Sequence, residues 1–193
     1  DDPDLPMWIV FDRTINGLFN TSSNVTALAA LNGTVCFSTD GGGNYQIRFI
    51  EDFGFRSNVT SATSTNFAGN ISERHTALGH VNIGRNAIVS QFCNDVAMTV
   101  LPNAPIDDAT GLPIPTIAVA TDGGVSVIKD DGTVASTQRG ANEVHSITFD
   151  KEYSQIFSWG TTSGFPRHIT RLPIALWSVS STSSSLWTNN YFS

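Results

Sequence analysis

The chain has 193 residues, which is enough for one ordinary domain or for part of a larger one. Charged residues make up only 14% of it, against the roughly 25% usual in soluble domains, and the formal net charge is −7. This charge and the lack of any Lys/Arg cluster argue against nucleic acid as a partner. No apolar run is long enough to span a membrane. Few Glu and Lys beside abundant Thr, Ser, Asn, Gly and Val favour an all-β fold without helices.

Strand-like runs separated by Asp- and Gly-containing turns follow one another along the whole chain. Residues 7–19 form a predicted hairpin around Asn16-Gly17. Four blade-like units come next, near residues 24–56, 57–92, 93–137 and 141–174. The second unit is the weakest, because residues 57–72 are polar and low in pattern. Residues 174–188 supply further terminal strands, which are interrupted by a run of serines.

A short pattern recurs at a near-constant interval within these units. Its copies are residues 38–45 (STDGGGNY), 80–87 (HVNIGRNA), 120–127 (ATDGGVSV) and, more weakly, 158–165 (SWGTTSGF). Their third positions are 40, 82, 122 and 160, at steps of 42, 40 and 38 residues. One four-stranded blade of a β-propeller takes about 40 residues. The repeat therefore predicts a β-propeller-like array of about four to five blades of antiparallel strands.

The sequence allows two arrangements of the blades at the ends of the array. Terminal strands in residues 7–19 and 174–188 can share one last blade, which removes exposed strand edges. The alternative is a sector of a larger ring that residues outside this chain complete. Both arrangements treat residues 1–193 as a single domain.

Residues 38–45 resemble the Asp box of sialidase-type propellers, usually S-x-D-x-G-x-T-W, with Asn44 and Tyr45 at its last two positions. In that family the box is a structural turn, so the resemblance makes these turns fold markers and not site residues. A sialidase also needs an arginine cluster and a Tyr–Glu nucleophile pair, while this chain has three Tyr and four Glu. A sialidase-like glycoside hydrolase is therefore the least favoured function.

Two groups of residues contain the side-chain types that bind metal ions. Glu73, His75 and His80 lack the helical HExxH spacing and an evident third ligand, so we interpret them as polar strand or loop residues. Asp107 and Asp108 lie in a proline-rich loop that lacks the dense carboxylates of a calcium loop, so we expect a solvent-exposed insertion. No catalytic, cofactor-binding or metal-binding residue is predicted.

Cys36 and Cys93 both lie in apolar runs without a CxxC partner. A disulfide between them is one alternative. Two buried free thiols that pack as small hydrophobic side chains are the preferred interpretation.

Residues 94–128, from Asn94-Asp95-Val96-Ala97 to Val125-Ser126-Val127-Ile128, resemble propeller-type segments of large bacteriophage virion proteins, namely tail-fibre or tail-associated proteins. The opening residues 4–11 are similar to the beginning of such segments. The resemblance implies a location in the virion and contacts with other virion proteins, with further copies of the chain or with a host-surface glycan. It carries over no catalytic residue and no cofactor.

These observations predict a non-enzymatic structural and adhesive module of a bacteriophage tail or fibre. A carbohydrate-binding module is the second hypothesis, because Trp side chains beside polar loops can stack on sugars. The four candidates are Trp8, Trp159, Trp177 and Trp187.

Overall fold

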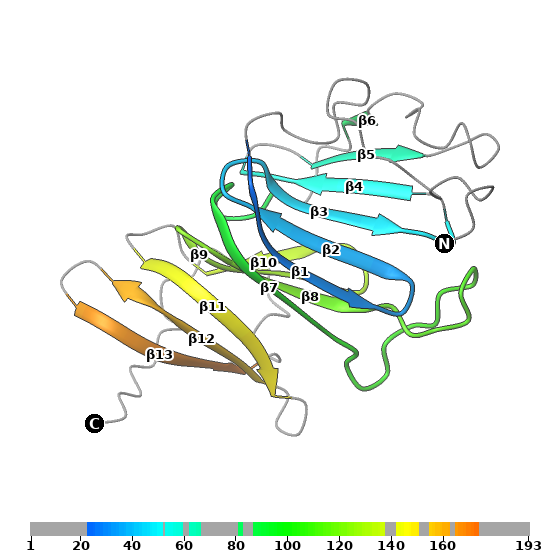
Figure 1. Ribbon diagram of the computed structural model, residues 1–193. Helices are drawn as coiled ribbons and strands as arrows, with labels where there is room; N and C mark the ends of the chain where they lie inside the picture. Colours follow the sequence, from blue (N-terminus) through cyan, green and yellow to red (C-terminus); the bar gives the residue numbers. More distant parts are fainter. Residues whose placement is uncertain are drawn as a thin grey trace, which may run out of the picture.

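The computed structural model describes residues 23–51, 53–59, 62–66, 81–82, 87–137, 142–150, 155–162 and 165–173. These residues form strands, turns and loops and no helix, which confirms the prediction of an all-β chain. The strands form three antiparallel sheets of six, four and three strands, and none of the three closes on itself (Figure 1). No helix in this part of the chain is long and apolar enough to cross a membrane.

The first sheet is a meander in which each strand pairs with the next one in sequence. Its six strands are β1 (Val25–Leu31), β2 (Thr34–Thr39), β3 (Gly43–Arg48), β4 (Phe53–Ser57), β5 (Ala62–Asn66) and β6 (Val81–Asn82). The region 57–92, which the sequence marks as a unit of its own, thus adds β5 and β6 to the first sheet.

The second and third sheets coincide closely with the predicted units 93–137 and 141–174. The second sheet contains β7 (Cys93–Thr99), β8 (Thr116–Thr121), β9 (Gly124–Ile128) and β10 (Val134–Ser136). The third sheet contains β11 (Asn142–Asp150), β12 (Gln155–Thr162) and β13 (Phe165–Pro173). The expected terminal strands in 7–19 and 174–188 lie outside the described residues.

Two of the recurring turns have the same local chemistry. The hydroxyl of Thr39 accepts a hydrogen bond from the Gly42 amide (3.0 Å) and donates one to the Gly43 carbonyl (3.0 Å). The Thr121 hydroxyl does the same with Gly123 (3.1 Å) and Gly124 (2.9 Å). These bonds hold the β2–β3 and β8–β9 turns in the tight form that the Asp-Gly sequences predict.

Glycine is required where each of these two turns re-enters the sheet. Gly43 has φ +97° and Gly124 has φ +122°, a region that favours glycine. A Cβ on Gly43 would also collide with the Ser57 carbonyl oxygen of β4. The first turn contains one residue more than the second, since Thr39 pairs with Gly43 while Thr121 pairs with Gly124.

The second sheet lies between the other two (Figure 1), and β7 contacts both β1 and β11. One apolar core fills the space between the first and second sheets; it contains Cys36, Ile88, Cys93, Val96, Ile117, Val119 and Ile128. The other core lies between the second and third sheets; it contains Ala118, Ala120, Val125, Val127, Ala135, Val144, Ile147 and Ile156. We call these contacts the first joint and the second joint.

Each sheet carries a β-bulge near the start of its first strand. The register shifts between Val25 and Ala27 in β1, between Cys93 and Asp95 in β7, and between Val144 and Ser146 in β11. The extra residues are therefore Thr26, Asn94 and His145, and we call them the bulge residues. A bulge inserts one residue and re-aims its side chain. Because the bulge recurs in all three sheets, their residues can be matched one by one by counting from it.

The weakest copy of the repeat does not align in this way. Gly160 pairs with Val144, so it occupies the position of Thr39 and Thr121 and not that of the turn aspartates. A Cβ on Gly160 would collide with the Glu143 carbonyl, which shows how closely β11 approaches at the bulge.

Candidate functional site

The bulge residues connect neighbouring sheets through side-chain hydrogen bonds. Thr26 Oγ1 donates to the carbonyl of Cys93 at 2.8 Å across the first joint. Asn94 Nδ2 donates to the carbonyl of Val144 at 2.9 Å across the second joint. Cys93 and Val144 both stand directly before a bulge, so the two bonds are equivalent. Thr26 and Asn94 thus each hold the first strand of the next sheet.

A carboxylate strengthens the second joint. Asp95 Oδ2 accepts hydrogen bonds from the Ser146 hydroxyl and the Ile147 amide of β11, both at 2.9 Å. Hydrogen bonds to an ionised acceptor are shorter and stronger than neutral ones. The equivalent residue of the first sheet is Ala27, which has no polar side chain to offer. The two joints therefore differ in polarity although their backbone geometry is shared.

The turn aspartates are also bound within the fold. Asp40 accepts hydrogen bonds from the backbone amide and the side-chain amide of Asn24, both at 2.7 Å. These bonds lower the pKa of Asp40 below its ordinary range. Asp122 accepts one hydrogen bond from Asn94 Nδ2 at 2.9 Å. Both aspartates fasten the turn to the beginning of the first strand of the same sheet.

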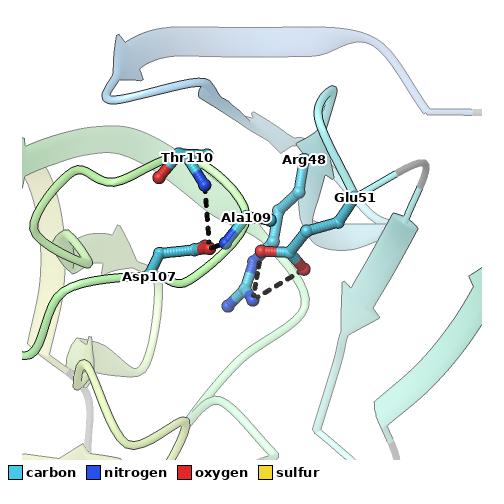
Figure 2. Close-up of polar contacts among 5 residues, drawn as sticks. All are labelled: Arg48, Glu51, Asp107, Ala109 and Thr110. Atoms are coloured by element: carbon cyan, nitrogen blue, oxygen red, sulfur yellow. Dashed lines mark hydrogen bonds and ion pairs between the residues drawn. The ribbon is translucent and has the colours of Figure 1, made fainter.

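A separate polar cluster lies where the end of β3 meets the proline-rich loop (Figure 2). Arg48 Nη1 lies 3.3 Å from Glu51 Oε2, and both residues belong to the first sheet and its turn. Asp107 comes from the loop and accepts hydrogen bonds from the amides of Ala109 (2.7 Å) and Thr110 (3.2 Å). This cluster brings three charged groups together from distant parts of the sequence.

The two carboxyl groups of this cluster share a hydrogen bond. Desolvation by burial and the hydrogen bond with Asp107 raise the pKa of Glu51, and the charge of Arg48 opposes the rise. The same hydrogen bond, with the amides of the loop, lowers the pKa of Asp107. The contact between the two carboxyl groups thus shifts their pKa values in opposite directions.

The hollow beside this cluster is small. Its walls include Gln46, Arg48, Asp107 and Thr110. The centre of a water-sized sphere can move within a volume of about 10 Å³ inside it. That is about the space of one water molecule. Gln46 Nε2 is buried and has no hydrogen-bond partner among the described residues, and a single water is a molecule of the right size to satisfy it. The cavity does not have room for a sugar or a nucleotide.

The proline-rich loop is an ordered small hairpin. Ile106 and Pro113 form a β-bridge, and Asn32 Nδ2 donates to the Pro113 carbonyl at 2.7 Å. Asp108 is exposed on its rim while Asp107 faces the first sheet. Among the described residues no three His, Cys, Asp or Glu side chains gather as a metal site needs. Glu73, His75 and His80 lie outside the described residues.

Both cysteines are free and buried in the first joint, as the preferred interpretation expected. Burial raises the pKa of each thiol to about 12. Cys36 also contacts the amide of Asn44, whose Nδ2 lies 3.1 Å from the sulfur. Neither thiol is activated as a nucleophile.

Of the four candidate tryptophans, the structure describes Trp159 alone. Its side chain is 37% exposed on β12 and packs on the ring of His145 with centroids 4.8 Å apart. Glu143 Oε1 lies 3.6 Å from His145 Nδ1. Sequence reasoning missed this pair, because the cross-strand register that joins residues 145 and 159 is set by the bulge. It also missed Arg48 and Glu51, for which the sequence carries no motif.

Comparisons with known proteins assign this chain to no family. No family model matches it, and no curated protein matches it. One solved structure is similar in outline: the extracellular domain of a putative one-component system from B. thetaiotaomicron. The identity is 10% and the TM-score is 0.38 over 82% of this chain. The chain spans 22% of the length of that protein, and a likeness this distant assigns neither fold family nor activity.

Proposed function

We propose that this chain is a non-enzymatic structural and adhesive module, built as a sector of a β-propeller with its three sheets as blades. The observation that carries the proposal is the use of its carboxylates. Asp40 and Asp122 fasten turns, and Asp95 binds the next sheet. Glycosidases need two carboxylates that face the substrate from about 5 to 9.5 Å apart. Here two of these carboxylates bind groups within their own sheet and the third binds the next sheet.

The propeller assignment is supported by the recurrence of one arrangement. Each sheet begins with a bulged strand, and the bulge residues of the first two sheets bind the strand before the next bulge. Such repetition of one sheet around an axis is the building principle of propellers. The tail or fibre of a bacteriophage is the proposed location, and it rests on the resemblance of residues 94–128. The partners are then other virion proteins.

The proposal is tested by substituting the turn aspartates with alanine, Asp40→Ala and Asp122→Ala. We expect a lower midpoint of unfolding and unchanged binding to partner proteins in the folded fraction. Cryo-electron microscopy of the parent particle then locates the chain. Density for the three sheets against neighbouring structural proteins supports the proposal. Hydrolysis of a glycoside by the purified chain, lost in either variant while it stays folded, contradicts it.

A carbohydrate-binding module is the second candidate, and the exposed Trp159 beside His145 is the observation that favours it. An exposed aromatic face can stack on a sugar ring. A glycan array probed with the chain and with Trp159→Ala separates the two candidates. Binding that the substitution abolishes supports a glycan ligand, and no binding to any glycan supports contact with protein.

A further inference from the structure

The aligned bulges allow the open face of the third sheet to be compared with the covered faces of the other two. The residues opposite the position after the bulge are Ser38, Ala120 and Trp159. Ser38 and Ala120 are both fully buried, on the faces that the next sheet covers. Trp159 is 37% exposed, and Ile169, its partner on β13, is 56% exposed. Among the described residues no further sheet covers this face of the third sheet, as the next sheet does in the first two.

The opposite end of the stack is open in a matching way. Leu28, Val96 and Ile147 occupy equivalent positions, two residues after the bulge residue of each first strand. Val96 is 6% and Ile147 5% exposed, because each packs into the joint with the preceding sheet. Leu28 of β1 is 65% exposed. One chain therefore carries both halves of a joint, at opposite ends.

At one of two facing positions, the open ends exchange the large and small side chains found inside the stack. Inside the stack, small residues of one sheet face large ones of the next: Ala118 and Ala120 lie in one core with Ile147 and Phe149. At the open end of the third sheet the positions of these alanines hold Phe157 and Trp159.

On β1 the position of Phe149 holds a small residue, Ala30, which is exposed. In such a contact Phe157 and Trp159 face one large side chain, Leu28, and one small one, Ala30. Close packing at a joint requires the volumes of facing side chains to match.

The hydrogen bond that a bulge residue makes inside the stack also has a counterpart at the two open ends. Thr26 and Asn94 donate to the carbonyl that precedes the bulge of the next sheet. The third bulge residue is His145, and the equivalent carbonyl of β1 belongs to Val25. We assign an N–H of the His145 ring as the donor to this carbonyl.

From this continuity we propose that a second copy of the chain docks head to tail, with its β1 on the open face of the third sheet. The contact repeats the two internal joints and rests on the proposed function as a propeller sector. An interface between two different patches is heterologous, so it forms a ring when the rotation closes and a filament when it does not. The partner is therefore this same protein, not an unrelated sheet.

The test uses the full chain and two variants, Leu28→Lys and Trp159→Lys, each of which damages one end. Sedimentation velocity across a wide concentration range measures their mass. We expect the wild type to associate, each variant to be monomeric alone, and a mixture of the two variants to form a dimer. The mixture restores one joint, because each variant keeps the end that the other has lost. Ile106→Lys, an exposed apolar residue on the proline-rich loop, is the matched control and keeps wild-type association.

Two results overturn the proposal: a wild type that stays monomeric at every concentration, or variants that do not complement when mixed. A monomeric wild type that still binds virion proteins disproves self-docking and leaves the proposed function standing. His145→Ala is expected to weaken association by roughly threefold to tenfold, the effect of one hydrogen bond. His145→Asn copies Asn94 and is expected to restore it; no rescue contradicts the assigned bond. Circular dichroism confirms that each variant is folded.

Discussion

The two joints of the stack have the same backbone geometry and different chemistry. Branched apolar side chains such as Ile117 and Val119 fill the first joint, and one bulge hydroxyl, that of Thr26, crosses it. In the second joint the middle sheet offers alanines beside Val125 and Val127, and Asp95 and Asn94 add three hydrogen bonds. Burial of apolar surface stabilises a fold by about 25 cal/mol per Å², and an alanine side chain buries little of it. The second joint thus adds these side-chain hydrogen bonds to an apolar core of its own.

The largest effect is expected from removing apolar volume from the first joint. Ile117→Ala deletes part of a side chain that is buried between the sheets, and such deletions cost about 2–5 kcal/mol. Urea unfolding measures the loss. Ile106→Ala removes the same atoms from an exposed position and is the control. A loss of the same size in both variants would show that the first joint is not a packed core.

A smaller but still clear effect is expected from removing the carboxylate of the second joint. Asp95→Ala leaves the Ile147 amide without its acceptor, at a cost of about 1.5–3 kcal/mol for a bond to a charged group. Asp95→Asn keeps one acceptor oxygen and should fall between the alanine variant and the wild type. Asp108→Ala, an exposed carboxylate of the proline-rich loop, is the matched control and should be neutral. An Asp95→Ala variant as stable as the wild type contradicts the assignment.

Removing the bulge hydroxyl of the first joint tests the comparison directly. Thr26→Val keeps the shape of the side chain and deletes its bond to the Cys93 carbonyl, so we expect a loss of about 0.5–1.5 kcal/mol. Thermal and urea unfolding of Thr26→Val and Asp95→Ala, measured side by side, rank the two joints. If the threonine variant loses more stability than the aspartate variant, the polar bonds do not dominate the second joint.

The sequence predicts strands and turns well because their signals are local. β-branched runs and the Asp-Gly turns locate β2, β3, β8 and β9, and the units 93–137 and 141–174 correspond to two of the sheets. The assignment of residues 57–92 to a sheet depends on which edge β5 joins, a pairing that no local signal carries.

The polar contacts of the joints are harder still to predict, because their partners are distant in sequence. Thr26 and Cys93 are 67 residues apart, and Asp95 and Ser146 are 51 apart. The bulges that bring them together leave no composition signal. Blade number and ring closure depend on such long-range contacts and stay predictions.

The smallest effect is expected at the carboxyl pair beside the proline-rich loop, outside both joints. The raised pKa of Glu51 gives stability that is complete below its ordinary value of 4.5 and is lost as pH rises through the folded-state pKa. The lowered pKa of Asp107 gives stability that is lost as pH falls below its ordinary value of 3.8.

Glu51→Gln keeps a donor for Asp107 at every pH, so its urea midpoint should not fall as the pH rises from mildly acid to neutral, while that of the wild type falls slightly. Asp108→Asn removes a neighbouring exposed carboxylate and should keep the wild-type slope. Equal slopes in Glu51→Gln and the wild type would mean that the pKa of Glu51 is not raised in the folded chain, and the pH dependence of stability would then have to arise elsewhere in the chain.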